Sequence, residues 1–180
     1  MFSPISCRSD RRGQPMNRYL NSGTASVVGA LALVLTGITS LQAGGLSVPP
    51  VRQATVQKEC SACHMLYPPA LLPARSWRQM LGTLGEHFGE NAELDEATAR
   101  TIADYLASNA GDTRKGASKV LRGLEATATP ARITELPWWR RKHEKKDRVA
   151  PATLAKKGAK FKGDCKACHK EAEKGYFDEE

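Results

Sequence analysis

The sequence lacks the alternating apolar and polar residues that are typical of a half-buried β-strand. Aromatic residues make up only 6% of its 180 residues, and no internal repeat is present apart from one pentapeptide that occurs twice. These absences give no support to a sheet or to a large independent core. Apolar residues at helical spacing are present instead, and they predict an all-α fold that is mostly helical with long loops.

Cysteine and histidine are also scarce, with five and four copies, but their positions are specific. The pentapeptide Cys-x-x-Cys-His occurs at Cys60–His64 and again at Cys165–His169. With these two residue counts, chance alone would give one such pentapeptide about 0.003 times in a chain of this length. The fifth cysteine, Cys7, lies near the start of the chain. No cysteine pair outside the two motifs is therefore left for a structural disulfide.

Cys-x-x-Cys-His is the attachment sequence of c-type haem. Two cysteines three residues apart project from one helical turn, so both sulfur atoms can form thioethers with the vinyl groups of one porphyrin. The histidine that follows, His64 or His169, is then held beneath the iron as its proximal ligand. The spacing therefore predicts two covalently bound haem c groups. The cysteines that would form the thioethers are Cys60 and Cys63 in the first motif, and Cys165 and Cys168 in the second.

Paired cysteines also occur in redox-active dithiols and in zinc sites. A thioredoxin-like Cys-x-x-Cys follows a strand in a βαβ pattern, which this sequence does not show. A zinc ribbon places its two cysteine pairs about 15–20 residues apart, whereas Cys63 and Cys165 are 165 − 63 = 102 positions apart. Both alternatives therefore fit the spacing less well than haem attachment does.

The first 43 residues follow the order of a secretory signal peptide, with a basic start, an apolar run and a small-residue end. The apolar run covers residues 27–35, and small and polar residues continue from it to Ala43. We expect cleavage near Ala43, with Met16 as an alternative start of the chain. The apolar run is short for a bilayer span, and an uncleaved membrane anchor is the alternative. The arginines of the basic start are Arg8, Arg11, Arg12 and Arg18.

The rest of the chain is expected to form two small haem-centred regions joined by a linker. The N-terminal region covers residues 44–111, and the C-terminal region covers residues 131–180. The linker, residues 112–130, is rich in Gly, Ala, Thr, Ser and Lys.

Four helices are expected, preceded by a loose lead-in at residues 44–50. Apolar spacing, prolines, glycines and capping residues set their limits. They run from Val51 into the first motif, from Ser76 to Phe88, from a cap at Asn91 to Gly111, and over residues 138–146.

Two histidines lie outside the motifs, one in each region. His87 shares an expected helical face with Met80, and His143 follows Trp139 by four residues. A lone histidine on an apolar face is more often a hydrogen-bonded core residue than a ligand. Here, however, each region has one iron and one spare histidine, so His87 and His143 are the predicted distal ligands. Met80 as ligand, or an open site, is the alternative at the first haem.

These motifs and their surroundings resemble the family of small dihaem cytochromes c of bacterial periplasms. The likeness spans most of the chain after the signal segment and misses only the linker. The matching stretches are Cys60–His64, Tyr67-Pro68-Pro69, Leu72-Pro73, Ser76-Trp77, Leu84–Gly89, Ile102, Tyr105-Leu106, Ile133-Thr134, Pro137-Trp138-Trp139, His143, Cys165–His169 and Ala172–Gly175.

The resemblance implies bis-histidine ligation of both haems, with His64 and His87 at the first and His169 and His143 at the second. It also implies a periplasmic electron carrier. Some members of the family pass electrons to a high-spin monohaem cytochrome c, and others accompany a membrane cytochrome b.

The leading hypothesis is therefore an electron-transfer protein and not an enzyme, because two imidazoles leave no position on the iron for a substrate. A fixed electron-transfer subunit of a membrane respiratory complex is an alternative. A small dihaem peroxidase is another, but it needs an open iron site, and such enzymes are about twice this length.

The chain between Arg140 and Lys162 is strongly basic. One interpretation is a solvated face that also supplies partners for the haem propionates. The other is a docking patch for an acidic redox partner. Nucleic acid is not expected as a partner of an exported protein.

Overall fold

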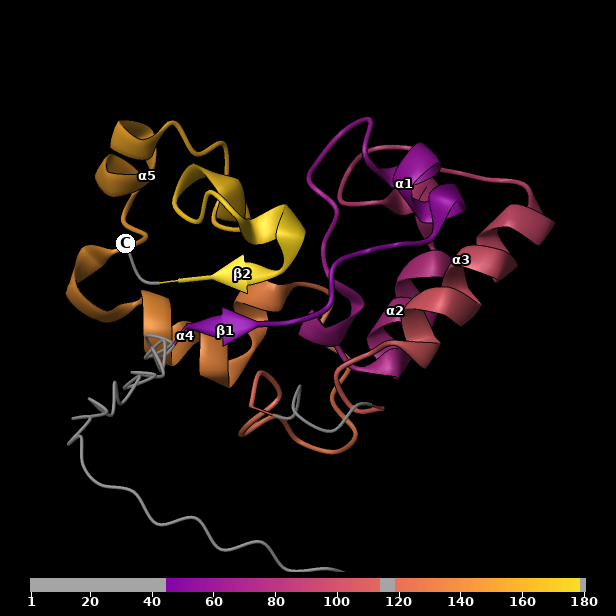
Figure 1. Cartoon of the computed structure of the whole chain (residues 1–180), viewed down its shortest axis with the longest axis horizontal. Coiled ribbons are helices and arrows are strands. Elements are labelled where there is room, and N and C mark those ends of the chain that lie inside the picture. The colour runs from indigo at the N-terminus through magenta and orange to yellow at the C-terminus, as the bar shows by residue number, and fades with distance from the viewer. Residues whose placement is uncertain (1–44, 114–118, 179–180) are drawn as a thin grey trace, which may run out of the picture. The chain divides into compact units, whose positions relative to one another are not determined.

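The computed structural model describes residues 45–113 and 119–178, and the expected signal segment lies outside them. Within these residues there are five α-helices, and none is long and apolar enough to cross a membrane. They are α1 Ala54–Cys60, α2 Ala74–Leu81, α3 Glu96–Ser108, α4 Pro137–His143 and α5 Pro151–Lys157 (Figure 1). Short 3-10 turns lie between them at Pro69–Leu71, Leu84–Glu86, Ile133–Glu135, Lys145–Asp147, Cys165–Ala167 and Ala172–Lys174. The predicted all-α fold with long loops is confirmed.

Helices α2 and α3 pack against each other, and α1 contacts α3 (Figure 1). Helix α3 begins after Asp95, whose carboxylate accepts a hydrogen bond from the amide of Thr98 at 3.0 Å. Its buried face includes Ile102, which is fully shielded from solvent. The predicted cap at Asn91 is wrong, because the Asn91 side chain accepts from the amide of Glu93 in the loop before the helix.

Helix α2 ends at Leu81, so the predicted continuation to Phe88 is wrong. Two glycines follow in the next four residues, and each costs a helix about 1 kcal/mol relative to alanine. The hydroxyl of Thr83 also donates to the carbonyl of Gln79 at 3.2 Å, which competes with a further helical turn. The chain instead makes a 3-10 turn, after which His87 adopts a non-helical backbone (φ −76°, ψ 83°).

Two short strands join the start and the end of the described chain. Strand β1 (Leu46–Ser47) pairs antiparallel with β2 (Tyr176–Phe177) (Figure 1). The amide of Val48 extends the pairing by donating to the carbonyl of Gly175 at 2.9 Å. The segment predicted as a loose lead-in is thus anchored, with Val48 buried. Strands of two residues are too short to leave an alternating pattern in the sequence.

The described part of the linker packs against α2. Arg75 of α2 donates to the carbonyl oxygens of Glu125 and Ala128, and Val120 is fully buried. One hydrophobic core contains residues from both sides of the linker, including Val51, Trp77, Ile102, Val120, Leu136 and Trp139. The described residues lie within one compact unit, Leu41–Glu180. The division into two haem-centred regions stays a prediction.

Helix α4 covers Pro137–His143 and is shorter than the predicted range of 138–146. Proline suits its first position, where no intrahelical partner is needed for the backbone N–H. A 3-10 turn follows and ends at Asp147, whose φ of 54° stops any helical continuation. Helix α5, which was not predicted, ends at Gly158 in the left-handed conformation.

Candidate functional site

The first motif lies at the end of α1. Cys60 is the last residue of the helix, and the motif then turns, so the predicted helix through the whole motif is wrong. Cys60 is partly buried and Cys63 is exposed. His64 donates from Nδ1 to the carbonyl of Met65 at 2.7 Å. This bond fixes the ring and leaves Nε2 free to bind a metal.

His87 faces His64 across a narrow gap. The centroids of the two rings are 6.2 Å apart, and their planes are tilted by 31°. Two imidazoles that bind one metal from opposite sides, with metal–nitrogen distances of about 2.0 Å, place their centroids about 6 Å apart. The separation therefore fits one metal ion held between the two rings.

Phe88 packs against His87, and Arg132 lies over Phe88. The Phe88 ring lies 4.8 Å from the His87 ring, and the Arg132 guanidinium lies 3.9 Å above the centroid of Phe88. Phe88 has a φ of 56°, which is uncommon for a residue with a side chain. Burial lowers the pKa of His87, and the charges of His64 and Arg132 lower it further. The imidazole is thus kept neutral, which is the form that binds metal.

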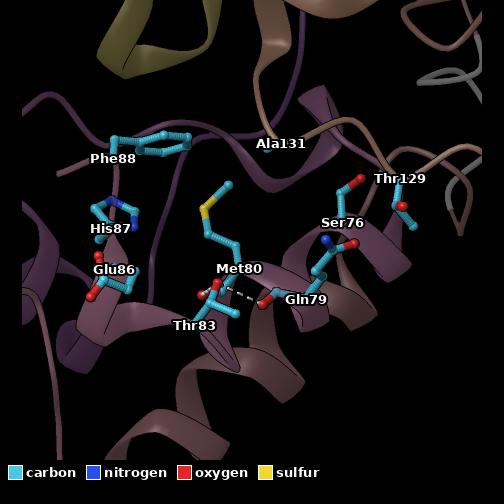
Figure 2. Close-up of a pocket in the computed structure, with 9 residues that line it drawn as sticks. All are labelled: Ser76, Gln79, Met80, Thr83, Glu86, His87, Phe88, Thr129 and Ala131. Atoms are coloured by element: carbon cyan, nitrogen blue, oxygen red, sulfur yellow. Dashed lines mark hydrogen bonds between the residues drawn. The ribbon is translucent and has the colours of Figure 1, made fainter.

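A cavity of about 150 Å³ lies beside His87, between α2 and the end of the linker. Figure 2 shows Met80 rising from α2 into this space, with His87 and Phe88 to one side and Ala131 beyond. The hydroxyl of Ser76, also in the wall, is buried and has no hydrogen-bond partner. Met80 is therefore close to the first site, and its role as an alternative ligand stays open.

The second motif begins with a 3-10 turn at Cys165–Ala167. The amide of His169 donates to the carbonyl of Cys165 at 2.7 Å, which closes the turn. The Nδ1 of His169 donates to the carbonyl of Asp178 at 2.7 Å, and the ring lies against Phe177. Strand β2 and the residue after it thus orient His169 and leave its Nε2 available.

His143, the last residue of α4, faces His169. The centroids of their rings are 6.1 Å apart, and the planes are nearly perpendicular at 80°. His143 stacks on Trp139 with centroids 4.3 Å apart and donates from Nδ1 to the Trp139 carbonyl at 2.9 Å. Burial lowers the pKa of His143, although the bond to Trp139 partly opposes this shift. The second pair therefore has the same metal-sized gap as the first.

The first cysteine of each motif, Cys60 or Cys165, carries a neutral thiol. Burial raises the pKa of Cys165 to about 12, and burial also raises that of Cys60. A reactive dithiol needs a lowered pKa and an exposed thiolate, so these cysteines do not resemble redox reagents. In residues 45–113 and 119–178, no three side chains of His, Cys, Asp or Glu gather closely enough to hold one ion.

The donor set fits haem c at both places, with two free thiols on one turn, a histidine after them and a second imidazole at metal-spanning distance. The sequence profile of dihaem cytochrome c matches residues 56–177. The chain belongs to the dihaem cytochrome c family.

Three solved structures are similar to this dihaem cytochrome c. A diheme cytochrome c from Rhodobacter sphaeroides is 50% identical, with a TM-score of 0.64, and the match covers 73% of this chain and 99% of the other. A crystal structure of DHC purified from Rhodobacter sphaeroides is 45% identical, with a TM-score of 0.57 and coverage of 71% and 99%. The diheme cytochrome sb-DHC from Shewanella baltica OS155 is 34% identical, with a TM-score of 0.54 and coverage of 69% and 86%. A comparison with curated proteins gives no match.

The family confirms the predicted cofactors, which are two covalently attached haem c groups. Each bound haem supplies an iron that takes up or gives up one electron. Sequence reasoning missed the contacts that orient the ligands, because they join distant parts of the chain. The sequence around Arg132 does not indicate that its guanidinium lies over Phe88, and the sequence around Tyr67 does not indicate its hydrogen bond to Gly163.

Proposed function

We propose that this dihaem cytochrome c is a periplasmic electron carrier in which both irons are bis-histidine ligated. His64 and His87 would bind the first iron, and His169 and His143 the second. The observation that supports this most directly is the pair of ring separations, 6.2 and 6.1 Å. Neither pair is close enough for the rings to hydrogen-bond each other, and both match the span across one metal.

Two imidazoles on each iron favour electron transfer over catalysis. An iron held by two histidines would have no position for a substrate, and its ligands would not need to change when its charge does. They also lack the methionine sulfur that raises the potential of other c-type cytochromes, so low reduction potentials are expected. A peroxidase would require one of the two irons to lose a histidine ligand, so that its substrate could bind there.

The proposed location rests on the signal-like first 43 residues. The proposed partner is a redox protein with an acidic surface, of the kind that the family resemblance implies, namely a high-spin monohaem cytochrome c or a membrane cytochrome b. The exposed basic residues that precede and follow His143 on the chain support docking near the second haem.

Replacement of the distal histidines tests the proposal. In the variant His143→Ala, we expect the second haem to become high-spin and to bind carbon monoxide, because no methionine lies beyond Met80. Absorption and EPR spectra should show one converted haem and one unchanged haem. The variant Glu144→Ala, at the next residue, should leave both haems low-spin. A fully low-spin His143→Ala protein would contradict the assignment.

The variant Met80→Leu separates the two candidates for the first iron. If His87 is the ligand, this variant keeps its low-spin spectrum, whereas His87→Ala loses it at the first haem. The opposite pattern would assign Met80 as the ligand.

A further inference from the structure

Tyr67 connects two segments that lie 96 positions apart in the sequence. Its ring packs against His64, with centroids 5.1 Å apart and planes tilted by 40°. Its hydroxyl donates a hydrogen bond to the carbonyl of Gly163 at 2.9 Å. Tyr67 therefore contacts the proximal histidine of the first site with its ring, and the backbone before the second motif with its hydroxyl.

The Gly163 carbonyl carries this contact into the second motif. It also accepts the backbone N–H of Cys165 at 2.8 Å, and the sulfur of Cys165 lies 3.3 Å away. Thioether formation removes the thiol proton but leaves the backbone bond intact. A continuous series of contacts thus runs from His64 to the cysteine that attaches the second haem.

The residues around Tyr67 hold this arrangement in place. Pro68 and Pro69 follow it, are buried, and restrict the backbone on one side. On the other side, a side chain at Gly163 would lie 3.0 Å from the ring of Phe161 and 3.6 Å from the Tyr67 hydroxyl. Glycine therefore leaves room for the Phe161 ring, whereas the Tyr67 hydroxyl would be in ordinary van der Waals contact with a side chain at this position.

We propose that Tyr67 is the electronic bridge between the two haem sites, an inference that rests on the electron-carrier function proposed above. One electron leaves the reduced site and enters the oxidised site through the Tyr67 ring and its hydrogen bond to Gly163. Tyr67 keeps its proton and is not itself oxidised. Tunnelling decays less steeply through covalent bonds and a short hydrogen bond than through a gap, so a path with one ring contact and one hydrogen bond speeds the transfer.

The variant Tyr67→Phe tests the bridge in the holoprotein, since it removes the hydroxyl and keeps the ring. A laser flash with a ruthenium photoreductant places less than one electron on each molecule, and transient absorption follows its redistribution between the haems. We expect this redistribution to slow by roughly tenfold, because a hydrogen bond of 2.9 Å becomes a nonbonded gap. The EPR signals and the reduction potentials of both haems should stay as in the wild type.

The variant Tyr105→Phe is the matched control. Tyr105 also uses its hydroxyl in a long-range bond, as it accepts from the amide of Arg52 at 2.9 Å, but neither residue belongs to a haem motif. Both variants lose one hydroxyl and one hydrogen bond, so a purely structural effect would be common to both. Slower redistribution should appear in Tyr67→Phe alone.

Two results would overturn the inference. One is a redistribution rate in Tyr67→Phe equal to that of the wild type, with both spectra intact. The other is redistribution that completes within the flash in both proteins, because the hydroxyl would then limit nothing. A wild-type protein without two low-spin haems would instead reject the proposed function, so the two failures are distinguishable.

Discussion

At the scale of single residues, the two sites differ in how their imidazoles are oriented. The ring planes are 31° apart at the first site and 80° apart at the second. Trp139 fixes the plane of His143 by stacking and by its carbonyl, whereas the carbonyl of Asp178 fixes His169. The same pair of ligands would therefore give two electronically distinct irons.

We expect the oxidised protein to show two different low-spin signals in EPR. Nearly parallel imidazoles separate the energies of two iron d orbitals and give a rhombic signal, as expected for the first site. Nearly perpendicular imidazoles leave these orbitals close in energy and give a strongly anisotropic signal with a large leading g value, as expected for the second. The variant Trp139→Leu should alter only the second signal. Two identical rhombic signals would contradict the observed angles.

Arg132 should tune the first haem through its charge. Its guanidinium lies over Phe88, which in turn contacts His87, and a nearby positive charge favours the reduced state. The variant Arg132→Gln should therefore lower the first potential by roughly 20–60 mV, since 59 mV corresponds to a tenfold change in a one-electron equilibrium. The second potential should not change. Spectroelectrochemical titration measures both.

The variant Arg132→Lys separates charge from stacking at this position. It keeps the positive charge but loses the flat guanidinium over the ring. A potential restored by lysine would assign the effect to charge. A potential that falls equally in both variants would instead point to a loss of the ring contact.

At the scale of elements, features that depend on neighbouring residues could be predicted from the sequence, and contacts between residues far apart in the sequence could not. The two motifs depend on spacing within five residues, and the confirmed haem attachment follows from them. The predicted end of α2 was wrong. The helical spacing of the apolar residues continues to Phe88, but the helix stops at Leu81, where two glycines follow within four residues. The pairing of β1 with β2 leaves no pattern at all in four residues, and the contact of Arg132 with Phe88 depends on folding of the linker.

Gly175 is the residue that allows β1 and β2 to meet. Its φ is 87°, and a Cβ there would lie only 1.8 Å from the carbonyl oxygen of Val48. The variant Gly175→Ala should lower the free energy of unfolding by about 3 kcal/mol, from backbone strain and overpacking together. Because the same segment carries Asp178, which orients His169, the second haem should also gain a high-spin fraction. Thermal unfolding and absorption spectra measure the two effects.

Gly158→Ala is the control for this prediction. Gly158 also has a positive φ, 69°, but a Cβ there would meet nothing within 4 Å. This variant should cost about 1 kcal/mol from strain alone and leave both haem spectra unchanged. Equal effects of the two variants would show that contact with β1 does not support the second site.

At the scale of the whole molecule, charge is small and unevenly placed. Without the first 43 residues the chain keeps 27 − 4 = 23 basic and 19 − 1 = 18 acidic side chains, a net charge of +5. Each bis-imidazole haem adds about −1 when ferric and about −2 when ferrous, which leaves roughly +3 and +1. Long-range attraction to a partner must therefore come from local patches.

The densest such patch is next to His143, where Lys142 and Lys145 are exposed. If electrons enter or leave at the second haem, the double variant Lys142→Glu, Lys145→Glu should slow association with an acidic redox partner and change neither haem spectrum. The wild-type rate should also fall as salt rises, because surface charges are screened over about 10 Å at 0.1 M. Stopped-flow kinetics at several ionic strengths measures both effects.

Two charge reversals in the N-terminal half of the chain serve as a matched control and test which haem faces the partner. Arg52 and Arg78 are exposed there, and Arg52→Glu with Arg78→Glu changes the net charge by the same amount. If docking takes place beside His143, this control should slow association far less than the reversals there do, since a surface charge acts mainly within about 10 Å at 0.1 M salt. Equal slowing by both pairs would show that only net charge matters, and a stronger effect of the control would assign docking to the first haem.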